Sequence, residues 1–175
     1  MAMRLHVIGS SPAWPNPGGA HSGYLLAAEG ASLLLDCGPG VLARLRESER
    51  WPTVDAIAIT HFHLDHWGDL VPWVWGSMYI SANGSVKRPE LWVHPGGREI
   101  LETLGERLGF PDMFDRVFTV RGYEDGVAFE TAGFEVLPLR LPHYALETYG
   151  FRVERGRATV AYSGDSGPSE RLAEL

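Results

Sequence analysis

The stretch that decides the fold is Thr60-His61-Phe62-His63-Leu64-Asp65-His66. It holds three of the chain's seven histidines together with an aspartate, directly after the apolar run at residues 54–60, which is typical of a buried strand. Imidazole and carboxylate groups at this density suit a zinc, manganese or iron ion. The alternative is a polar loop whose histidines gather by chance, and such a cluster without a metal would be costly to bury. The stretch therefore predicts a metal site at the end of a strand.

Alternation along an extended chain divides the four polar residues of this stretch between two positions. His61 and His63 point to the same side of an extended segment, so they can bind one ion. Asp65 and His66 follow after a bend and can bind a second ion. The sequence thus predicts two neighbouring metal positions.

The segments on either side of this stretch show strand and helix patterns in turn. The predicted strands are residues 4–7, 24–28, 32–36, 54–60, 91–94, 116–120, 127–129, 134–141, 149–154 and 159–163. The predicted helices are residues 41–49, residues 67–80 with breaks at Pro72 and Gly76, residues 98–108, and a segment beginning near Ser169. This order predicts an α/β or α+β layering, in which sheets carry helices on their outer faces, within a single domain over residues 1–175.

Composition and charge exclude some classes of function. The 175 residues are 45% hydrophobic and 21% charged, which suits one domain with a sizeable core. The net charge is −7, and the arginines of residues 44–50 alternate with glutamates. An extended nucleic acid requires clusters of Lys and Arg, and the sequence offers none.

Cysteine usage and hydropathy indicate the compartment. Cys37 is the only cysteine, which excludes an internal disulfide and fits a reducing environment. Residues 1–8 show no signal-peptide pattern, and no apolar run reaches the roughly 18 residues that a membrane span requires. We therefore expect a cytoplasmic protein without a membrane segment.

Three further motifs accompany the histidine stretch. They are Leu35-Asp36-Cys37-Gly38, Pro142-His143 with the later Tyr149-Gly150-Phe151-Arg152-Val153, and Tyr162-Ser163-Gly164-Asp165-Ser166. Together with the HxHxDH pattern of the stretch, they resemble the motifs of the metallo-β-lactamase superfamily, and the motif with Pro142-His143 is similar to that of ribonuclease Z-like hydrolases. The resemblance covers nearly the whole chain. It implies an αββα sandwich whose active site lies at one edge of two sheets.

The resemblance also implies a full set of metal ligands. The expected ligands are His61, His63 and His143 for the first metal, Asp65 and His66 for the second, and Asp165 as a bridge between them. Two divalent ions are expected, with zinc favoured and manganese as the alternative. Asp36 is expected to support a ligand histidine through its second ring nitrogen. Taken alone, His143 would be a structural histidine at a strand end, and Asp165 a turn residue.

The activity implied by the resemblance is hydrolysis by a hydroxide that bridges two divalent metal ions. Asp65 is the expected catalytic residue, since it can accept a hydrogen bond from the nucleophile and orient it. We expect a phosphodiesterase that acts on small or cyclic phosphodiesters. The alternatives are a carboxylic ester, thioester or lactone hydrolase of the glyoxalase II or lactonase type, and a metal-binding scaffold without catalysis.

Departures from the patterns of other superfamily members narrow the class. β-Lactamases commonly carry cysteine where Asp165 stands, and flavo-diiron oxidoreductases usually carry glutamate where His63 stands. The segment between His143 and Asp165 has room for a hairpin only, so the long exosite arm of transfer-RNA-processing ribonuclease Z has no place in it. The sequence therefore predicts the compact type of ribonuclease Z-like hydrolase, without the arm.

The expected partner is a small-molecule substrate. No extended nucleic acid and no membrane are expected, and a homodimer is left open. His21, in the loop after the first strand, is a candidate substrate contact. Trp67 and Trp73 follow the histidine stretch and are further candidates, because they could form a pocket wall. The alternative for both is a helix that buries its aromatic face.

The resemblance implies one more histidine ligand for the second metal, a proton donor, and further strands beyond the fourth motif. The chain ends at Leu175, ten residues after Asp165, and no histidine follows His143. We therefore expect residues 1–175 to be the N-terminal portion of the domain, with the remainder missing after residue 175.

Overall fold

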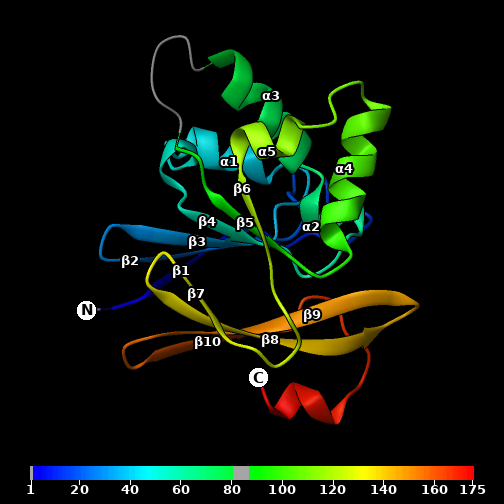
Figure 1. The fold of residues 1–175 in the computed structure, drawn as a ribbon. Coiled ribbons are helices and arrows are strands. Elements are labelled where there is room, and N and C mark those ends of the chain that lie inside the picture. Colours follow the sequence, from blue (N-terminus) through cyan, green and yellow to red (C-terminus); the bar gives the residue numbers. More distant parts are fainter. Residues whose placement is uncertain (1, 81–86) are drawn as a thin grey trace.

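Two β-sheets face each other, and helices cover the outer face of the larger sheet (Figure 1). The computed structural model describes residues 2–80 and 87–175. The larger sheet has six strands in the order β1-β2-β3-β4-β5-β6, and the smaller sheet has four in the order β10-β9-β8-β7. The predicted layering of sheets with helices outside them is confirmed.

The larger sheet changes from antiparallel to parallel pairing at its third strand. Its strands are β1 (Arg4–Gly9), β2 (Gly23–Ala28), β3 (Ala31–Leu35), β4 (Ala56–Ala58), β5 (Glu90–Val93) and β6 (Thr119–Gly122). A tight turn at Glu29 and Gly30, both with positive φ, joins β2 to β3 as an antiparallel hairpin. The strands from β3 to β6 pair in parallel, so the chain must cross back between them, and these crossovers carry the helices.

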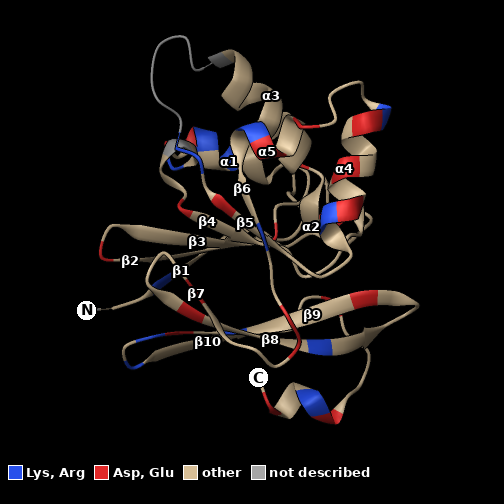
Figure 2. Cartoon of the chain, viewed as in Figure 1, with Lys and Arg blue, Asp and Glu red and all other residues tan. Residues whose placement is uncertain are grey.

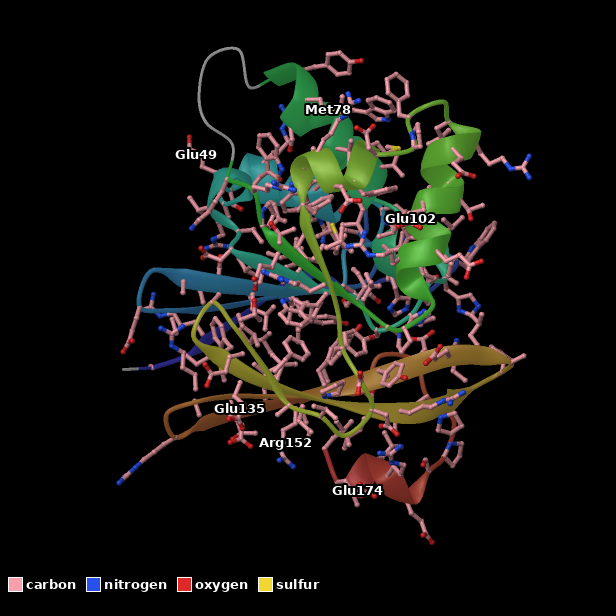
Figure 3. All side chains as sticks on the ribbon, in the orientation of Figure 1. Glu49, Met78, Glu102, Glu135, Arg152 and Glu174 are labelled. Atoms are coloured by element: carbon pink, nitrogen blue, oxygen red, sulfur yellow. The ribbon has the colours of Figure 1, made fainter. Side chains whose placement is uncertain are left out.

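The helices form one layer on this sheet (Figure 1). They are α1 (Val41–Glu47), α2 (Leu64–Trp67), α3 (Leu70–Ile80), α4 (Gly97–Arg107) and α5 (Met113–Val117), with a 3₁₀ turn η1 (Trp51–Thr53) after α1. Figure 3 shows Met78 of α3 and Glu102 of α4 on this side of the molecule, away from the smaller sheet.

Two sequence predictions in this layer are wrong. Helix α3 runs unbroken through Pro72 and Gly76, and the interruption lies instead at Gly68 and Asp69. Pro72 is the third residue of α3, where a backbone N–H has no partner within the helix, so proline removes no hydrogen bond there. The strand predicted at residues 116–120 is displaced, because α5 occupies its first part and β6 begins only afterwards.

The smaller sheet is an antiparallel meander of consecutive hairpins. Its strands are β7 (Phe129–Thr131), β8 (Phe134–His143), β9 (Leu146–Arg155) and β10 (Ala158–Tyr162). Each strand pairs with the next along the chain, and β8 and β9 are the longest, with ten residues each. The turn between β8 and β9 therefore projects to one edge of the sandwich.

The chain then passes to the outer face of the smaller sheet. Where the sequence predicted a helix near Ser169, the structure has a short 3₁₀ turn, η3 (Glu170–Ala173). The Arg152 guanidinium donates a hydrogen bond to the Glu174 carbonyl over 2.9 Å, and Figure 3 shows the two residues on the same side of the sheet. A Cβ on Gly150 would lie 2.6 Å from the end of the Leu175 side chain, so the final residue packs closely against β9.

Alternate residues of the central strands fill two separate cores. Leu34 and Ile57 point toward the helices, where they pack with Trp73 and the other members of that cluster. Leu33 and Phe151 pack between the two sheets. Because β2, β3 and β4 are largely buried on both faces, these strands are almost continuously apolar. This packing fixes the two sheets face to face, with the ends of β3 and β4 and the β8–β9 turn at one edge (right in Figure 1).

Charged residues of both signs are distributed along the described elements. Lys and Arg are interspersed with Asp and Glu over the elements visible in Figure 2. Within residues 2–80 and 87–175, the longest helices have 11 residues, and none has the length and apolar character needed to cross a bilayer.

Candidate metal centre

The histidine stretch leaves the larger sheet where two parallel strands end side by side. Strand β4 ends at Ala58, and His63 is the extended residue that precedes α2. The single turn of α2 then carries Asp65 and His66. Strand β3 lies next to β4 in parallel register, so Asp36, which follows β3, is placed at the same edge. Short loops at strand ends thus bring distant motifs together.

Four of the predicted ligands form a first group, in which ring nitrogens converge. The Nε2 atom of His61 lies 3.1 Å from Nδ1 of His63, and Nε2 of His143 also lies 3.1 Å from that Nδ1 atom. Asp165 completes the group, and all four ligand atoms lie within 4.8 Å of one another. His143 arrives at this point from the end of β8, on the opposite sheet.

A second group shares Asp165 with the first. The Nε2 atom of His66 lies 3.5 Å from Asp65 Oδ2 and 3.4 Å from Asp165 Oδ1. The other oxygen of Asp165, Oδ2, lies 3.6 Å from Nε2 of His143. Asp165 therefore offers one carboxylate oxygen to each group. The structure brings all six predicted ligands together in the predicted grouping.

The chemistry of these side chains fits divalent cations. Nδ1 of His63 faces ring nitrogens of both His61 and His143, and one shared proton cannot satisfy three converging nitrogens. A cation can satisfy all three. Three imidazoles with one carboxylate, and one imidazole with two carboxylates, are donor sets that zinc accepts.

Asp36 is the buried centre of a hydrogen-bond network behind the ligands. Its carboxylate is fully buried and accepts a hydrogen bond from the Thr60 backbone N–H over 2.8 Å. It also accepts from the Tyr162 hydroxyl, and Nδ1 of His66 lies within hydrogen-bonding distance, each at 2.7 Å. Asp36 has a positive φ of 58°, a conformation that aspartate tolerates better than most residues. The sequence predicted a supporting role for Asp36, whereas Tyr162 was part of a quoted motif but had no predicted role.

The two buried histidines of the centre have opposite pKa shifts. Burial, followed by the neighbouring histidines, lowers the pKa of His61 to about 2, so this ring is neutral at pH 7 and has a lone pair to offer. Burial also acts to lower the pKa of His66. The hydrogen bond to Asp36 and the charges of three nearby carboxylates outweigh burial, so that its pKa is raised. Positive charge is thus favoured on the side of the centre where the carboxylates lie.

Two predicted substrate contacts lie in the core instead. Trp73 is 1% exposed and packs against Trp51 and Phe118 in the helix layer. Trp67 is buried as well, and its indole N–H donates to the Phe62 carbonyl over 3.0 Å. The helical geometry of α2 and α3 turns both rings toward the sheet, which is a packing position and corrects the prediction of substrate contact.

His21 lies in the loop after β1, close to the centre. A Cβ added to Gly38 would lie 2.7 Å from the His21 Cβ and 1.9 Å from the Asp65 carbonyl oxygen, so the three backbones are in close contact. The His21 ring is buried, and its Nδ1 atom has no hydrogen-bond partner among the described residues. Its role as a substrate contact stays a prediction.

An open hollow adjoins the ligands. It has a volume of about 470 Å³ and is lined by Ala13, Phe62, His63, Leu64, Asp65, His143, Tyr144 and Asp165. Tyr144, at the β8–β9 turn, is 93% exposed and has a positive φ of 48°. Its ring centroid lies 4.7 Å from that of His143. The sequence analysis missed Tyr144, although its position directly after a predicted ligand was a usable signal.

The fold and the ligand arrangement define a ribonuclease Z-like protein of the metallo-β-lactamase superfamily. The crystal structure of the metallo-β-lactamase fold protein YhfI from Bacillus subtilis is similar to this chain, with a TM-score of 0.82, 25% identity, and coverage of 97% of this chain and 65% of that one. Human tRNase Z, short form, shares the fold with a TM-score of 0.75 at 23% identity, over 98% of this chain and 73% of that one. The metallo-β-lactamase fold expected from the motifs is confirmed, and the described residues supply its two sheets and the helix layer on the larger one.

The chain belongs to the family described as Anti-Pycsar protein Apyc1, which matches residues 3–174. Among curated relatives, the probable metallo-hydrolase YhfI of Bacillus subtilis is 29% identical over 170 residues, covering 94% of this chain and 64% of the relative. Ribonuclease Z of Mycolicibacterium paratuberculosis is 30% identical over 194 residues, covering 99% of this chain and 66% of the relative. The chain thus spans just under two thirds of the length of these relatives.

Proposed function

We propose that the protein is a metal-dependent hydrolase that cleaves small or cyclic phosphodiesters. The observation that carries the proposal is the pair of ligand groups that share Asp165 beside an open hollow. Two adjacent cation positions joined by one carboxylate are the arrangement of two-metal phosphoryl-transfer sites. The names of the relatives support the class, since one is a probable metallo-hydrolase and another a ribonuclease.

Each group would hold one divalent ion, zinc in the first instance and manganese as the alternative. The residues that would hold them are His61, His63 and His143 for one ion, Asp65 and His66 for the other, and Asp165 for both. When bound, the ions supply Lewis acidity, which makes a water acidic enough to yield hydroxide at about pH 7 and offsets the negative charge that develops on the substrate.

The chain's own residues orient the reacting groups. Asp65 lines the hollow with a carboxylate that can accept a hydrogen bond from the attacking water and fix its direction. Asp36 lies behind His66 and holds the proton on Nδ1, so that Nε2 faces the carboxylates of Asp65 and Asp165. A fully buried carboxylate in this position restrains the ring without touching the substrate.

The shape and charge of the surface favour a small substrate. A hollow of about 470 Å³ lies within the range of small-molecule sites. Its walls combine the ligand groups with Phe62, Leu64 and the exposed ring of Tyr144, which suits a phosphodiester that carries an apolar or planar group. The net charge of −7 opposes the binding of an extended nucleic acid.

A substrate panel tests the proposed function. The full-length protein, loaded with zinc or manganese, is assayed against a cyclic nucleotide, bis(p-nitrophenyl) phosphate, p-nitrophenyl phosphate, a thioester, a lactone and a transfer RNA precursor. Hydrolysis of the two diesters should be fastest, and the precursor should be left uncut. Faster turnover of the thioester or lactone would contradict the phosphodiesterase proposal, and no turnover of any substrate would favour a metal-binding scaffold.

Replacing Tyr144 with alanine is expected to raise KM about tenfold for a nucleotide substrate, because stacking on an aromatic ring contributes roughly 1–3 kcal/mol per base. Turnover at saturation should change little, since Tyr144 offers no group to the ligand positions and its contribution would be to binding. Steady-state kinetics on the cyclic nucleotide measure both constants. Tyr79→Ala, at an exposed aromatic on α3, is the matched control and should leave KM unchanged. An unchanged KM in Tyr144→Ala would remove this residue from the site.

A further inference from the structure

A single hydroxyl lies between the carboxylate of Asp36 and the ring of His61. Oγ1 of Thr60 lies 2.9 Å from Asp36 Oδ2 and 3.1 Å from Asp36 Oδ1, and it lies 3.0 Å from His61 Nδ1. All three residues have 0% exposure, so bulk water does not compete for these contacts. The three side chains form one continuous path from the carboxylate to the ring.

The direction of the protons along this path follows from acceptor strength. Thr60 has one hydroxyl proton, and a carboxylate is a stronger acceptor than a neutral imidazole nitrogen. The hydroxyl therefore donates to Asp36 and presents a lone pair to Nδ1 of His61. That nitrogen must carry the ring proton to complete the hydrogen bond. Nε2 of His61 is then left unprotonated, and it is the atom that faces His63.

The same carboxylate contacts His66 directly. The Nδ1 atom of this histidine lies 2.7 Å from Asp36 Oδ2, so the carboxylate accepts the Nδ1 proton. Nε2 of His66 is left to face Asp65 and Asp165. One buried carboxylate therefore acts on one histidine in each ligand group, directly on His66 and through a hydroxyl on His61.

We propose that Thr60 is a positioning residue that relays the Asp36 carboxylate to His61 and fixes the tautomer in which Nε2 of His61 can bind a metal. The inference rests on the proposed metal centre, in which the free Nε2 atom of His61 is one of the metal ligands. Its geometry does not depend on the substrate. A residue that orients a ligand's second nitrogen commonly changes metal affinity by about 10–100-fold when it is lost.

The test compares two substitutions that differ in one hydroxyl. Thr60→Val keeps the shape of the side chain and removes the hydroxyl, whereas Thr60→Ser keeps the hydroxyl. In the metal-free, full-length protein with ¹⁵N-labelled histidine, NMR should find the Nδ1–H tautomer at His61 in the parent and in Thr60→Ser, and its loss in Thr60→Val. His66 should keep the Nδ1–H form in all three proteins, because its acceptor is Asp36 itself, and it serves as the internal control.

Zinc affinity gives the second measurement, by competition with a chelator. Thr60→Val should weaken one of the two zinc-binding steps by about 10–100-fold, and Thr60→Ser should stay within about twofold of the parent. Finding the Nε2–H tautomer at His61 in the parent protein would overturn the inference. This measurement uses the parent alone, so it does not depend on whether a variant folds. Equal zinc affinities in the two variants would also overturn it. If the parent bound no zinc, the proposed metal centre would fail, and the tautomers would still decide the role of Thr60.

Discussion

Replacing Asp165 with alanine is expected to weaken zinc binding at both positions by more than about 100-fold. Losing a residue that only supports a ligand weakens metal binding by up to about 100-fold, and Asp165 is itself a proposed ligand. Its two oxygens lie 3.4 Å from Nε2 of His66 and 3.6 Å from Nε2 of His143, so one side chain serves both ligand groups. The loss is measured as the zinc content after dialysis against a weak chelator. Competition with a chelator gives the stepwise dissociation constants.

The control for this substitution is an aspartate with a surface role. Asp112 precedes α5 and pairs with Arg116 over 2.8 Å, with both side chains exposed. Asp112→Ala should therefore leave zinc binding unchanged. Two equivalents of zinc bound by Asp165→Ala with the affinity of the parent would show that Asp165 is a turn residue and would leave the two ligand groups unconnected.

Replacing Asp65 with asparagine is expected to lower turnover by about 10²–10⁴-fold while the fold is retained, as for the loss of a group that accepts or transfers a proton. The amide has nearly the same shape as the carboxylate but is a weaker acceptor for the attacking water. Asp65 also belongs to the second ligand group, so turnover is measured at saturating zinc to separate orientation from metal loss. Circular dichroism checks the fold.

Asp115→Asn is the matched control, because Asp115 is an exposed aspartate of α5 that pairs with Arg98. It should keep the turnover of the parent. If Asp65→Asn at saturating zinc also kept the parent's activity, Asp65 would have a structural role only, and another group would have to orient the nucleophile.

The proposed ligands could be picked out from the sequence because each lies in a short motif near the end of a strand. His61, His63, Asp65 and His66 lie within six consecutive residues, and the apolar run before them indicates the buried strand that ends at this edge. Strands β8 and β9 were also predicted, with boundaries up to three residues short, and β10 was predicted within one residue, because alternation of apolar residues depends only on local sequence. The strand predicted at residues 127–129 overlaps β7 at Phe129 alone.

The features that failed depend on packing between distant segments. In the sequence, Trp67 and Trp73 were equally compatible with a pocket wall and with a buried core. Only the packing of α2 and α3 against the sheet decides between these two positions. The hydrogen bonds from Thr60 and Tyr162 to Asp36 join residues 24 and 126 positions away along the chain. The spacing of residue types along the sequence does not indicate contacts between residues so far apart.

The division of the ligands between the two sheets has a kinetic consequence. His61 and His63 follow a strand of the larger sheet, whereas His143 ends β8 and Asp165 follows β10 in the smaller one. A sub-global opening that parts the sheets, with each sheet intact, would break the ligand groups in a single step. The residence time of a bound ion would then be governed by the packing between the sheets. Side chains such as Phe151, buried in that interface, would set how long the ion stays.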